Sequence, residues 1–350
     1  MDAAVPEVSV LVATHNAGAF LRPALASLLD QAGVDLEVVL VDNASTDGSV
    51  DAAVAALPDP RLRLVRLSEN RLHAGGLIAG LPHCRGGYVA MMDADDLSLP
   101  GRLTAQADFL RTHPEVDLLG CLVERMDAAG RPLGAMFSLT RPGDIRAYMP
   151  YDVPFALNAT MARADFWRRV GWRLHFCWAH DYDFFTRAAE AGTLVCLPQV
   201  LYRYRVHAAA VSQHRAGQLL VSAGFARLAA ARRRRGQAED VAALREEHDQ
   251  RQENPLPEPA AYRWFARRFL REDHGLLAVM HARRAGLSAA GCWLLVRACF
   301  CAMFESGPVP ALRMALLGPA HALRVQSTPA LRPRGWNLFR SQRGPESRPT

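Results

Sequence analysis

The sequence contains no lysine, so all 41 of its Lys and Arg residues are arginines, and the formal net charge is +6. The absence of lysine excludes a Walker-type phosphate loop, which depends on that residue. No GxGxxG motif follows the first predicted strand, which argues against a dinucleotide site. The positive charge suits anionic partners such as nucleotides or a membrane face. We expect no nucleic-acid partner.

The sequence also lacks long apolar runs and paired cysteines. No uncharged apolar stretch reaches roughly 18 residues, so no membrane-spanning helix is expected. Residues 1–8 have neither the basic start nor the apolar core of a signal peptide. The cysteines are odd in number and scattered, which favours free, buried thiols in a reducing compartment, the cytoplasm, over a disulfide or zinc framework. The seven cysteines are at positions 84, 121, 177, 196, 292, 299 and 301.

Short apolar runs alternate with helical patterns through the first third of the chain. Apolar runs bounded by polar residues are typical of buried strands. Strands that alternate with helices predict an α/β fold, a doubly wound, mostly parallel, Rossmann-like sheet with helices on both faces. The predicted strands are residues 8–13, 36–41, 62–67, 88–92 and 116–123.

Polar residues follow three of these strands, at positions 14–16, at Asp42 and at positions 93–96. Ligands of doubly wound sheets bind beyond the carboxyl ends of the strands, so these residues are expected to converge. The carboxylates of the third group repel one another unless positive charge lies between them. Mg2+ or Mn2+ bound to a diphosphate would supply that charge through oxygen ligands. The alternative is an acidic loop in which Asp95 or Asp96 caps the following helix.

A second group of candidate residues lies between positions 180 and 207. Asp181 and Asp183 open a predicted helix that runs to about residue 192, and acidic helix starts are common because the helix dipole favours carboxylates there. Arg203, Arg205 and His207 follow two short predicted strands, 193–197 and 200–204. They could contact a phosphate or a metal, or they could form a solvated basic strand end.

The chain changes character after about residue 213. Helical sequence rich in Ala and Arg is followed by a charged, proline-containing linker at about 246–259 and by amphipathic helices. Residues 292–304 are strongly apolar but include Arg297, which fits either a packed helix or a helix on a membrane face. We predict an α/β domain at 6–213, a helical region at 214–335 and a disordered tail at 336–350.

Six segments, taken together, resemble one family. The resemblance is to the family 2 inverting glycosyltransferases of the GT-A fold, and the order and spacing of the segments agree with it over roughly residues 6–213. It implies that the predicted α/β domain is a catalytic domain. The segments are VSVLVATHN (8–16), VDNASTDGS (41–49), YVAMMDADD (88–96), HPEVDLLG (113–120), HDYDFFTR (180–187) and LYRYRVH (201–207).

The resemblance implies a nucleotide pocket at the first two strand ends. Thr14 and Asn16 would line it, and Asp42 would accept hydrogen bonds from the base or the ribose. His15 stands where the family usually has a tyrosine that stacks on the base, and an imidazole can stack with less area.

The resemblance also implies a DxD pair, in which Asp95 would bind the metal, and Asp93 the ribose or the metal. Arg203 and Arg205 would contact the donor phosphates, and His207 the metal. Each role is an expectation for the residue at that position of this sequence.

Asp181 falls where the family places its catalytic base. A carboxylate there would take the proton of an acceptor hydroxyl, while Mg2+ or Mn2+ neutralises the departing diphosphate. The expected reaction moves a sugar from a nucleotide-diphosphate donor, UDP being favoured, to a saccharide or lipid-linked acceptor in cell-envelope polysaccharide or glycolipid synthesis. Peripheral contact with the inner face of the cell membrane is part of this expectation.

Two positions depart from the family pattern. Leu77 and Ile78 stand where the family commonly has Arg-Asn, so a phosphate contact is lost: either Arg71 or another arginine replaces it, or the donor is held differently. His180 stands where the family usually has Glu. These departures motivate an alternative hypothesis, a non-catalytic nucleotide-binding module of the same fold that acts as a partner or scaffold.

Overall fold

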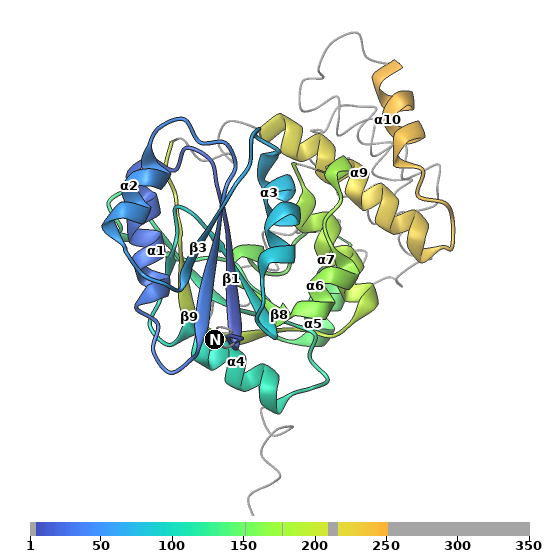
Figure 1. Ribbon diagram of the computed structural model, residues 1–350. Coiled ribbons are helices and arrows are strands. Elements are labelled where there is room, and N and C mark those ends of the chain that lie inside the picture. Colours follow the sequence, from blue (N-terminus) through green and yellow to red (C-terminus); the bar gives the residue numbers. More distant parts are fainter. Residues whose placement is uncertain (1–4, 151, 177, 209–215, 251–350) are drawn as a thin grey trace, which may run out of the picture. The chain divides into compact units, whose positions relative to one another are not determined.

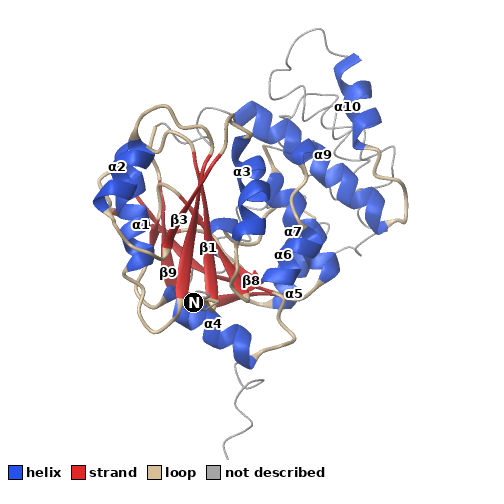
Figure 2. Cartoon of the chain, in the orientation of Figure 1, coloured by secondary structure: helices blue, strands red, loops and turns tan. Residues whose placement is uncertain are grey.

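The computed structural model describes residues 5–150, 152–176, 178–208 and 216–250, all within one compact unit, Met1–Phe265 (Figures 1 and 2). Most of the predicted linker, the amphipathic helices beyond it, the apolar segment 292–304 and the tail 336–350 lie outside the described residues, as do four of the seven cysteines. The other three, at positions 84, 121 and 196, are free and buried, as predicted.

The described chain forms one sheet of nine strands in the order β3-β2-β1-β4-β8-β6-β9-β5, with β7 paired to β6. Six strands, β3, β2, β1, β4, β6 and β9, run parallel, whereas β8, β5 and β7 are antiparallel to their neighbours. The predicted α/β fold with a mostly parallel sheet is therefore confirmed. The strands are β1 Val8–Thr14, β2 Leu36–Asp42, β3 Leu62–Arg66, β4 Tyr88–Asp93, β5 Leu97–Ser98, β6 Leu118–Met126, β7 Pro132–Ala135, β8 Met161–Arg163 and β9 Leu194–Arg205.

Helices cover both faces of the sheet, and each face has its own apolar core. One core contains side chains of α1 (Leu21–Leu29), α2 (Ser49–Ala56) and α4 (Arg102–Thr112). The other contains side chains of α3 (Leu72–Gly80), α5 (Pro142–Tyr148), α6 (Ala164–Val170) and α7 (His180–Ala191). The short 3-10 helices are η1 Gly18–Phe20, η2 Leu81–His83, η3 Leu157–Ala159 and η4 Leu174–Phe176.

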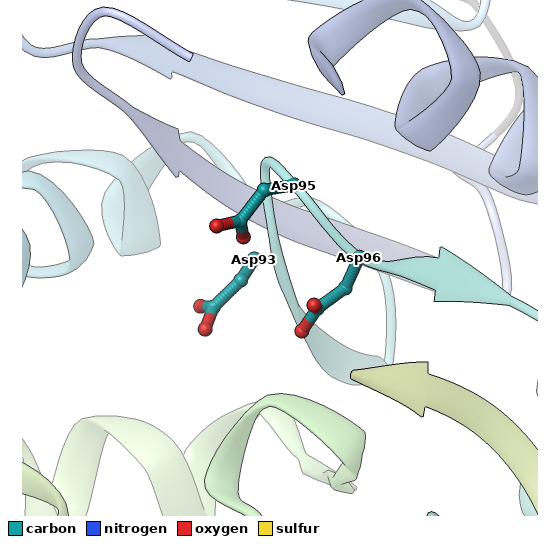
Figure 3. A group of neighbouring side chains, drawn as sticks. All are labelled: Asp93, Asp95 and Asp96. Carbon is teal, nitrogen blue, oxygen red and sulfur yellow. The ribbon is translucent and has the colours of Figure 1, made fainter. Parts of the chain in front are cut away.

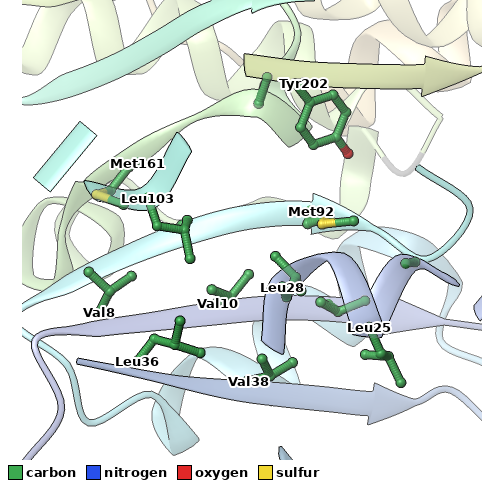
Figure 4. Packing of buried hydrophobic residues seen from close by; sticks show 14 of the residues in the cluster. Val8, Val10, Leu25, Leu28, Leu36, Val38, Met92, Leu103, Met161 and Tyr202 are labelled. Carbon is green, nitrogen blue, oxygen red and sulfur yellow. The ribbon is translucent and has the colours of Figure 1, made fainter. Parts of the chain in front are cut away.

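The central strands are mostly apolar on both sides because both sides are covered; Ser9 and Glu37 are buried polar exceptions that hydrogen-bond to each other. Every residue of β1 and β2 is buried, as expected for parallel strands between two helical layers. Figure 4 shows Leu25 and Leu28 of α1 packed over Val10 and Val38 of these two strands. On the other face, a Cβ atom at Gly80 would lie 2.5 Å from side-chain carbons of both strands, so only glycine lets α3 approach this closely.

Two sequence-based element predictions are wrong. The segments 193–197 and 200–204 are not separate strands: apart from residue 193, both belong to β9, in which the register with β6 shifts between Leu197 and Tyr202. The first residues of the predicted linker, 246–250, are helical, because α10 runs Val241–Gln250. Helix α9, Ala216–Arg234, lies against α7. Within the described residues, no helix combines the length and apolarity needed to cross a membrane.

Candidate active site

Three carboxylates gather where β4 ends (Figure 3). Asp93 is the last residue of β4, and Asp95 and Asp96 follow in the turn that leads to β5. One oxygen from each carboxylate lies within 4.8 Å of the others. The alternative in which Asp95 or Asp96 caps the following helix is wrong, because α4 begins behind Gly101 and has no side-chain cap.

The three carboxylates differ in accessibility. Asp96 is fully buried, whereas the side chains of Asp93 and Asp95 keep 32% and 30% of their surface exposed. The Asp96 carboxylate is therefore fixed inside the wall of the site, while Asp93 and Asp95 can face a ligand. The donors to Asp96 are the Tyr202 hydroxyl at 2.7 Å, the Asn158 amide at 2.7 Å and the Arg205 backbone N–H at 2.7 Å.

The carboxylates perturb one another. Burial and the charges of Asp93 and Asp95 raise the pKa of Asp96 well above its usual value, and burial and Asp93 raise the pKa of Asp95. Burial also acts to raise the pKa of Asp93, but contacts with His73 and Asn158 outweigh it and hold that pKa below its usual value. A divalent cation would relieve this repulsion, and the oxygen donors present fit Mg2+ or Mn2+.

The end of β9 closes the other side of the cluster. His207 Nε2 lies 2.8 Å from Asp95 Oδ2, and the imidazole ring packs on Phe20 with the ring centroids 4.8 Å apart. This imidazole could join Asp93 and Asp95 around a cation, as the sequence predicts.

The two arginines of β9 are engaged within the protein. The Arg205 guanidinium donates to the backbone carbonyls of Asp95 and Ala128 at 2.6 and 2.9 Å. Arg203 forms an ion pair with Glu124 at 2.8 Å and keeps 33% of its side chain exposed. The fold thus brings Arg205 to the acidic loop and directs Arg203 toward β6. Their predicted phosphate contacts remain predictions.

A buried guanidinium stands behind the acidic loop. Arg102, the first residue of α4, is fully buried, and its guanidinium lies 4.9 Å from the centre of the Tyr202 ring. It donates to the Met91 carbonyl at 2.7 Å and to the Gln106 side chain at 3.1 Å. It forms no ion pair with any carboxylate of the described chain, so the wall behind Asp96 contains a fixed positive charge.

The ends of β1 and β2 meet beside the cluster. The loop after β1 is tied to the loop after β2, because Asn16 Oδ1 accepts the Thr46 N–H at 2.8 Å and His15 Nδ1 lies 3.0 Å from the Asn43 carbonyl. Thr14 is buried, and its hydroxyl has no hydrogen-bond partner among the described residues.

Asp42, at the end of β2, is also buried. Its carboxylate accepts the Ser45 N–H at 2.9 Å and pairs with Arg66 at 2.9 Å. The predicted convergence of the β1, β2 and β4 ends is therefore present, while the roles of Thr14, His15, Asn16 and Asp42 in nucleotide binding remain predictions.

The second half of α3 contains two of the family departures noted in the sequence, Leu77 and Ile78. Leu77 is buried in the core and Ile78 is 37% exposed. Arg71, the proposed substitute, pairs with Glu69 at 3.2 Å. One turn before Leu77, the His73 side chain faces the acidic cluster, with Nε2 3.3 Å from Asp93 Oδ1.

Asp181 lies in the first turn of α7 and is partly buried. Its Oδ1 accepts the Tyr182 N–H at 2.7 Å. Burial, reinforced by the charge of Asp152, raises the pKa of Asp181 to about 6. The preceding His180 places its Nε2 3.0 Å from His73 Nδ1. Asp181 is therefore next to a residue that contacts the partner of Asp93.

Asp183, two residues further along α7, has a structural role. Its carboxylate is buried and pairs with Arg173 and with Arg187, the latter at 2.8 Å. The sequence placed Asp181 and Asp183 together at a helix start, and the structure separates them into a partly accessible carboxylate and a buried ion pair.

Three residues of the site were not predicted from the sequence as site residues: His73, Asn158 and Tyr202. Asn158 donates to Asp93 as well as to Asp96, at 2.9 and 2.7 Å. The Tyr202 hydroxyl accepts the Asp93 N–H at 3.2 Å. Of the three, only Tyr202 had a signal in the sequence, its place in the segment LYRYRVH. A tyrosine in an apolar strand is equally consistent with a core residue.

Comparison with known proteins gives a consistent family match. The model of the glycosyl transferase family 2 matches residues 9–162. The chain is 40% identical over 126 residues to the succinoglycan biosynthesis protein ExoO of Rhizobium meliloti, which covers 36% of this chain and 31% of that protein. It is 34% identical over 207 residues to the putative glycosyltransferase EpsE of Bacillus subtilis (57% of this chain, 73% of that protein). It is 31% identical over 214 residues to the amylovoran biosynthesis glycosyltransferase AmsE of Erwinia amylovora (59% and 79%).

Solved structures agree on the fold. S. aureus TarS, residues 1–349, superposes with a TM-score of 0.51 at 16% identity and covers 92% of both chains. Further TarS structures contain UDP, with a TM-score of 0.51, or UDP-GlcNAc, with a TM-score of 0.52, each at 16% identity. At this identity the likeness concerns the fold, which is the GT-A fold of glycosyltransferases.

Proposed function

Because the chain belongs to glycosyl transferase family 2, we propose that it transfers a sugar from a nucleotide-diphosphate donor to a saccharide or lipid-linked acceptor, with inversion and with Mg2+ or Mn2+. The names of its relatives, which concern succinoglycan and amylovoran biosynthesis, support a role in cell-envelope polysaccharide or glycolipid synthesis. UDP, which TarS binds in its crystals, is the first nucleotide to test.

One observation carries this proposal. Two partly exposed carboxylates, Asp93 and Asp95, stand at the carboxyl end of the central strand β4, and a third, Asp181, is brought to the same edge by α7. A transferase of this kind needs carboxylates for a cation and a separate one for the acceptor. Asp181 and the carboxylates of the acidic loop have different hydrogen-bond partners, which supports separate roles for them in proton transfer and in cation binding.

The residues of the acidic loop would hold the cation. Asp93, Asp95 and His207 offer two carboxylates and one imidazole for Mg2+ or Mn2+, which when bound neutralises charge on the departing diphosphate. Asp96 and its hydrogen-bond donors hold the loop in shape. Arg205 keeps the loop against β9 through the Asp95 carbonyl.

Asp181 would act as the general base. A carboxylate whose pKa is about 6 is mostly ionised near neutral pH and is a better proton acceptor than an ordinary one. It would take the proton of an acceptor hydroxyl as that oxygen attacks the sugar carbon, while the bond from that carbon to the diphosphate oxygen breaks. A single displacement inverts the anomeric centre.

The donor nucleotide would lie over the ends of β1 and β2. Thr14 and Asn16 would line its pocket, His15 would stack on the base, and Asp42 would accept a hydrogen bond from the base or ribose. The unpartnered Thr14 hydroxyl supports this placement, since a buried hydroxyl without a partner is costly. Arg203, which is partly exposed, and Arg205, which is held against the acidic loop, are the arginines proposed to contact the phosphates.

Two substitutions separate binding from chemistry. Asp95→Ala should weaken UDP binding in the presence of Mn2+, measured by calorimetry, and abolish turnover of UDP-sugars. Asp181→Asn should leave UDP affinity within about threefold of the wild type and abolish turnover, because only the proton acceptor is lost.

Asp165→Asn is a matched control. Asp165 lies in the first turn of α6, is exposed, and accepts the next residue's N–H at 2.8 Å as Asp181 does. This variant should keep binding and turnover. Turnover that survives both Asp95→Ala and Asp181→Asn would refute the mechanism. Tight, Mn2+-dependent UDP binding by the wild type without turnover of any donor would instead support the non-catalytic module.

We propose the cytoplasm as the compartment. Free, buried cysteines at positions 84, 121 and 196 support action in the reducing cytoplasm. Peripheral contact with the inner face of the membrane is part of the proposal, to be measured by co-sedimentation of the full chain with anionic vesicles.

A further inference from the structure

We propose that His73 and His180 are positioning residues that fix helix α7, and with it Asp181, at a set distance from Asp93. This inference rests on the proposed function, because it assigns Asp181 the role of base. His73 and His180 are 107 positions apart in the chain, yet nitrogen atoms of their imidazoles lie within hydrogen-bond distance of each other.

The contact is a continuous chain of polar atoms. Asp93 Oδ1 lies 3.3 Å from His73 Nε2, and His73 Nδ1 lies 3.0 Å from His180 Nε2. The two rings are tilted by 57° with centroids 5.0 Å apart. The chain therefore runs from the end of β4, through α3, to the residue that precedes Asp181.

The two contacts of His73 differ in kind. His73 Nε2 faces Asp93 Oδ1 at 3.3 Å without the geometry of a hydrogen bond, so this contact is electrostatic. His73 Nδ1 and His180 Nε2 share one hydrogen bond, in which Nδ1 accepts the His180 Nε2–H or donates its own hydrogen to His180 Nε2, according to the tautomers. The link between the helices is made in either state, so its positioning role needs no change of protonation.

His73 is itself held firmly. It is the second residue of α3, and the Asn43 side chain at the end of β2 fixes the backbone just before it. Asn43 accepts the Arg71 N–H at 2.8 Å and donates to the Leu72 carbonyl at 2.9 Å. Leu72 is held at a φ of 59°, a conformation that leucine rarely adopts. The backbone that carries the His73 side chain is therefore held in place.

The first turn of α7 is stabilised by the contact between His73 and His180. Its N-cap residue is Ala179, and no side chain caps the helix, so the first turn depends on side chains that reach out from it. Asp183 anchors the turn on one side through Arg173 and Arg187. His180 ties it to the sheet edge, in the direction of the acidic loop.

Breaking the link should lower the rate and leave donor binding intact. A displacement of a reacting group by about 1 Å can cost on the order of 100-fold in rate. We therefore expect His73→Ala and His180→Ala each to lower kcat about 100-fold with KM for the donor unchanged. The double variant should lose no more than either single one, because the chain is already broken. His180→Gln, whose amide can donate to His73 Nδ1, should recover at least tenfold of the loss.

The assay uses a panel of UDP-sugars with Mn2+, and water as the acceptor. His83→Ala is the matched control, since His83 is exposed in η2 at the far end of α3. A raised KM at unchanged kcat in His73→Ala would overturn the inference and make His73 a donor-binding residue. Failure of His180→Gln to recover any rate would overturn it as well.

Hydrogen exchange of residues 180–186 in the free protein decides the inference independently of turnover. Both alanine variants should exchange faster there than the wild type and His83→Ala, while melting temperatures stay within a few degrees. Unchanged exchange would overturn the inference even if UDP-sugars are consumed. Absence of UDP binding and turnover in the wild type, with faster exchange in the variants, would instead refute the proposed function and leave the link established.

Discussion

Asp181→Asn should make the protein more stable at the same time as it abolishes turnover. The substitution keeps the side-chain shape and the oxygen that accepts the Tyr182 N–H, and it removes a charge that burial disfavours. The carboxyl pKa is about 6 in the folded protein and 3.8 ordinarily. A carboxylate with a raised pKa in the folded state lowers stability where it is ionised, so removing the charge restores that stability.

The size of the effect depends on pH. Above about pH 6 the Asp181 carboxylate is ionised in both the folded and the unfolded protein. The difference between its two pKa values then lowers the free energy of unfolding by about 3 kcal/mol, at about 1.4 kcal/mol per pH unit. As pH falls from about 6 toward 3.8, only the unfolded chain stays ionised, and the penalty fades. The stability gain of Asp181→Asn should thus be about 3 kcal/mol at pH 8, about half of that at pH 5, and close to zero below pH 4.

Denaturant unfolding, followed by tryptophan fluorescence at pH 8 and pH 5, measures the gain. Asp165→Asn is again the control: its exposed carboxylate benefits from the start of α6, so its loss should cost about 0.3–1 kcal/mol at both pH values. In the wild type, turnover should fall about tenfold per pH unit below about pH 6 as the base is protonated. Equal or lower stability of Asp181→Asn at pH 8 would refute the claim that burial penalises this carboxylate.

Three further substitutions test the framework of the site. Asp183→Ala leaves two arginines without their buried partner and should cost about 3–5 kcal/mol in denaturant unfolding; a loss below 1 kcal/mol would contradict it. Gly80→Ala forces a Cβ atom to within 2.5 Å of side chains of β1 and β2 and should cost about 1–3 kcal/mol, again by unfolding. Tyr202→Phe removes the hydroxyl that joins Asp96 to the Asp93 backbone and should weaken Mn2+-dependent UDP binding about tenfold by calorimetry, a cost of about 1.4 kcal/mol; unchanged affinity would show that the bridge does not shape the loop.

The parallel strands could be predicted from the sequence because strands that are buried on both faces have mostly apolar runs of residues. Strands β1, β2 and β4 are each predicted to within one residue at either end, since a mostly apolar run is followed at once by polar residues. β8 has only three residues and lies in a stretch of irregular pattern, and it was missed. The sequence divides β9 at Pro198, because a proline interrupts a strand pattern; in the fold Pro198 and Gln199 fall in the register shift, where they have no partner residue in β6.

The site was predictable where chemistry is concentrated in a short segment. Asp93 and Asp95 stood out because three carboxylates follow one strand within four residues, and Asp181 stood out because it falls where the resembled family places its base. His73 and Asn158 could not be found in this way, because each acts through one contact with a residue distant in the chain. Such contacts are created by folding and leave no local pattern.

The arginine sealed behind the acidic loop gives the site a counter-charge that cannot leave. If a cation binds and leaves in each catalytic cycle, the carboxylates of Asp93, Asp95 and Asp96 repel one another whenever it leaves, unless another positive charge is present. Because Arg102 remains in place throughout, we expect the emptied pocket to keep its shape and to accept the next donor without refolding. If the proposed cation is required, chelators should leave the protein folded but inactive, and activity should return when Mg2+ or Mn2+ is added back.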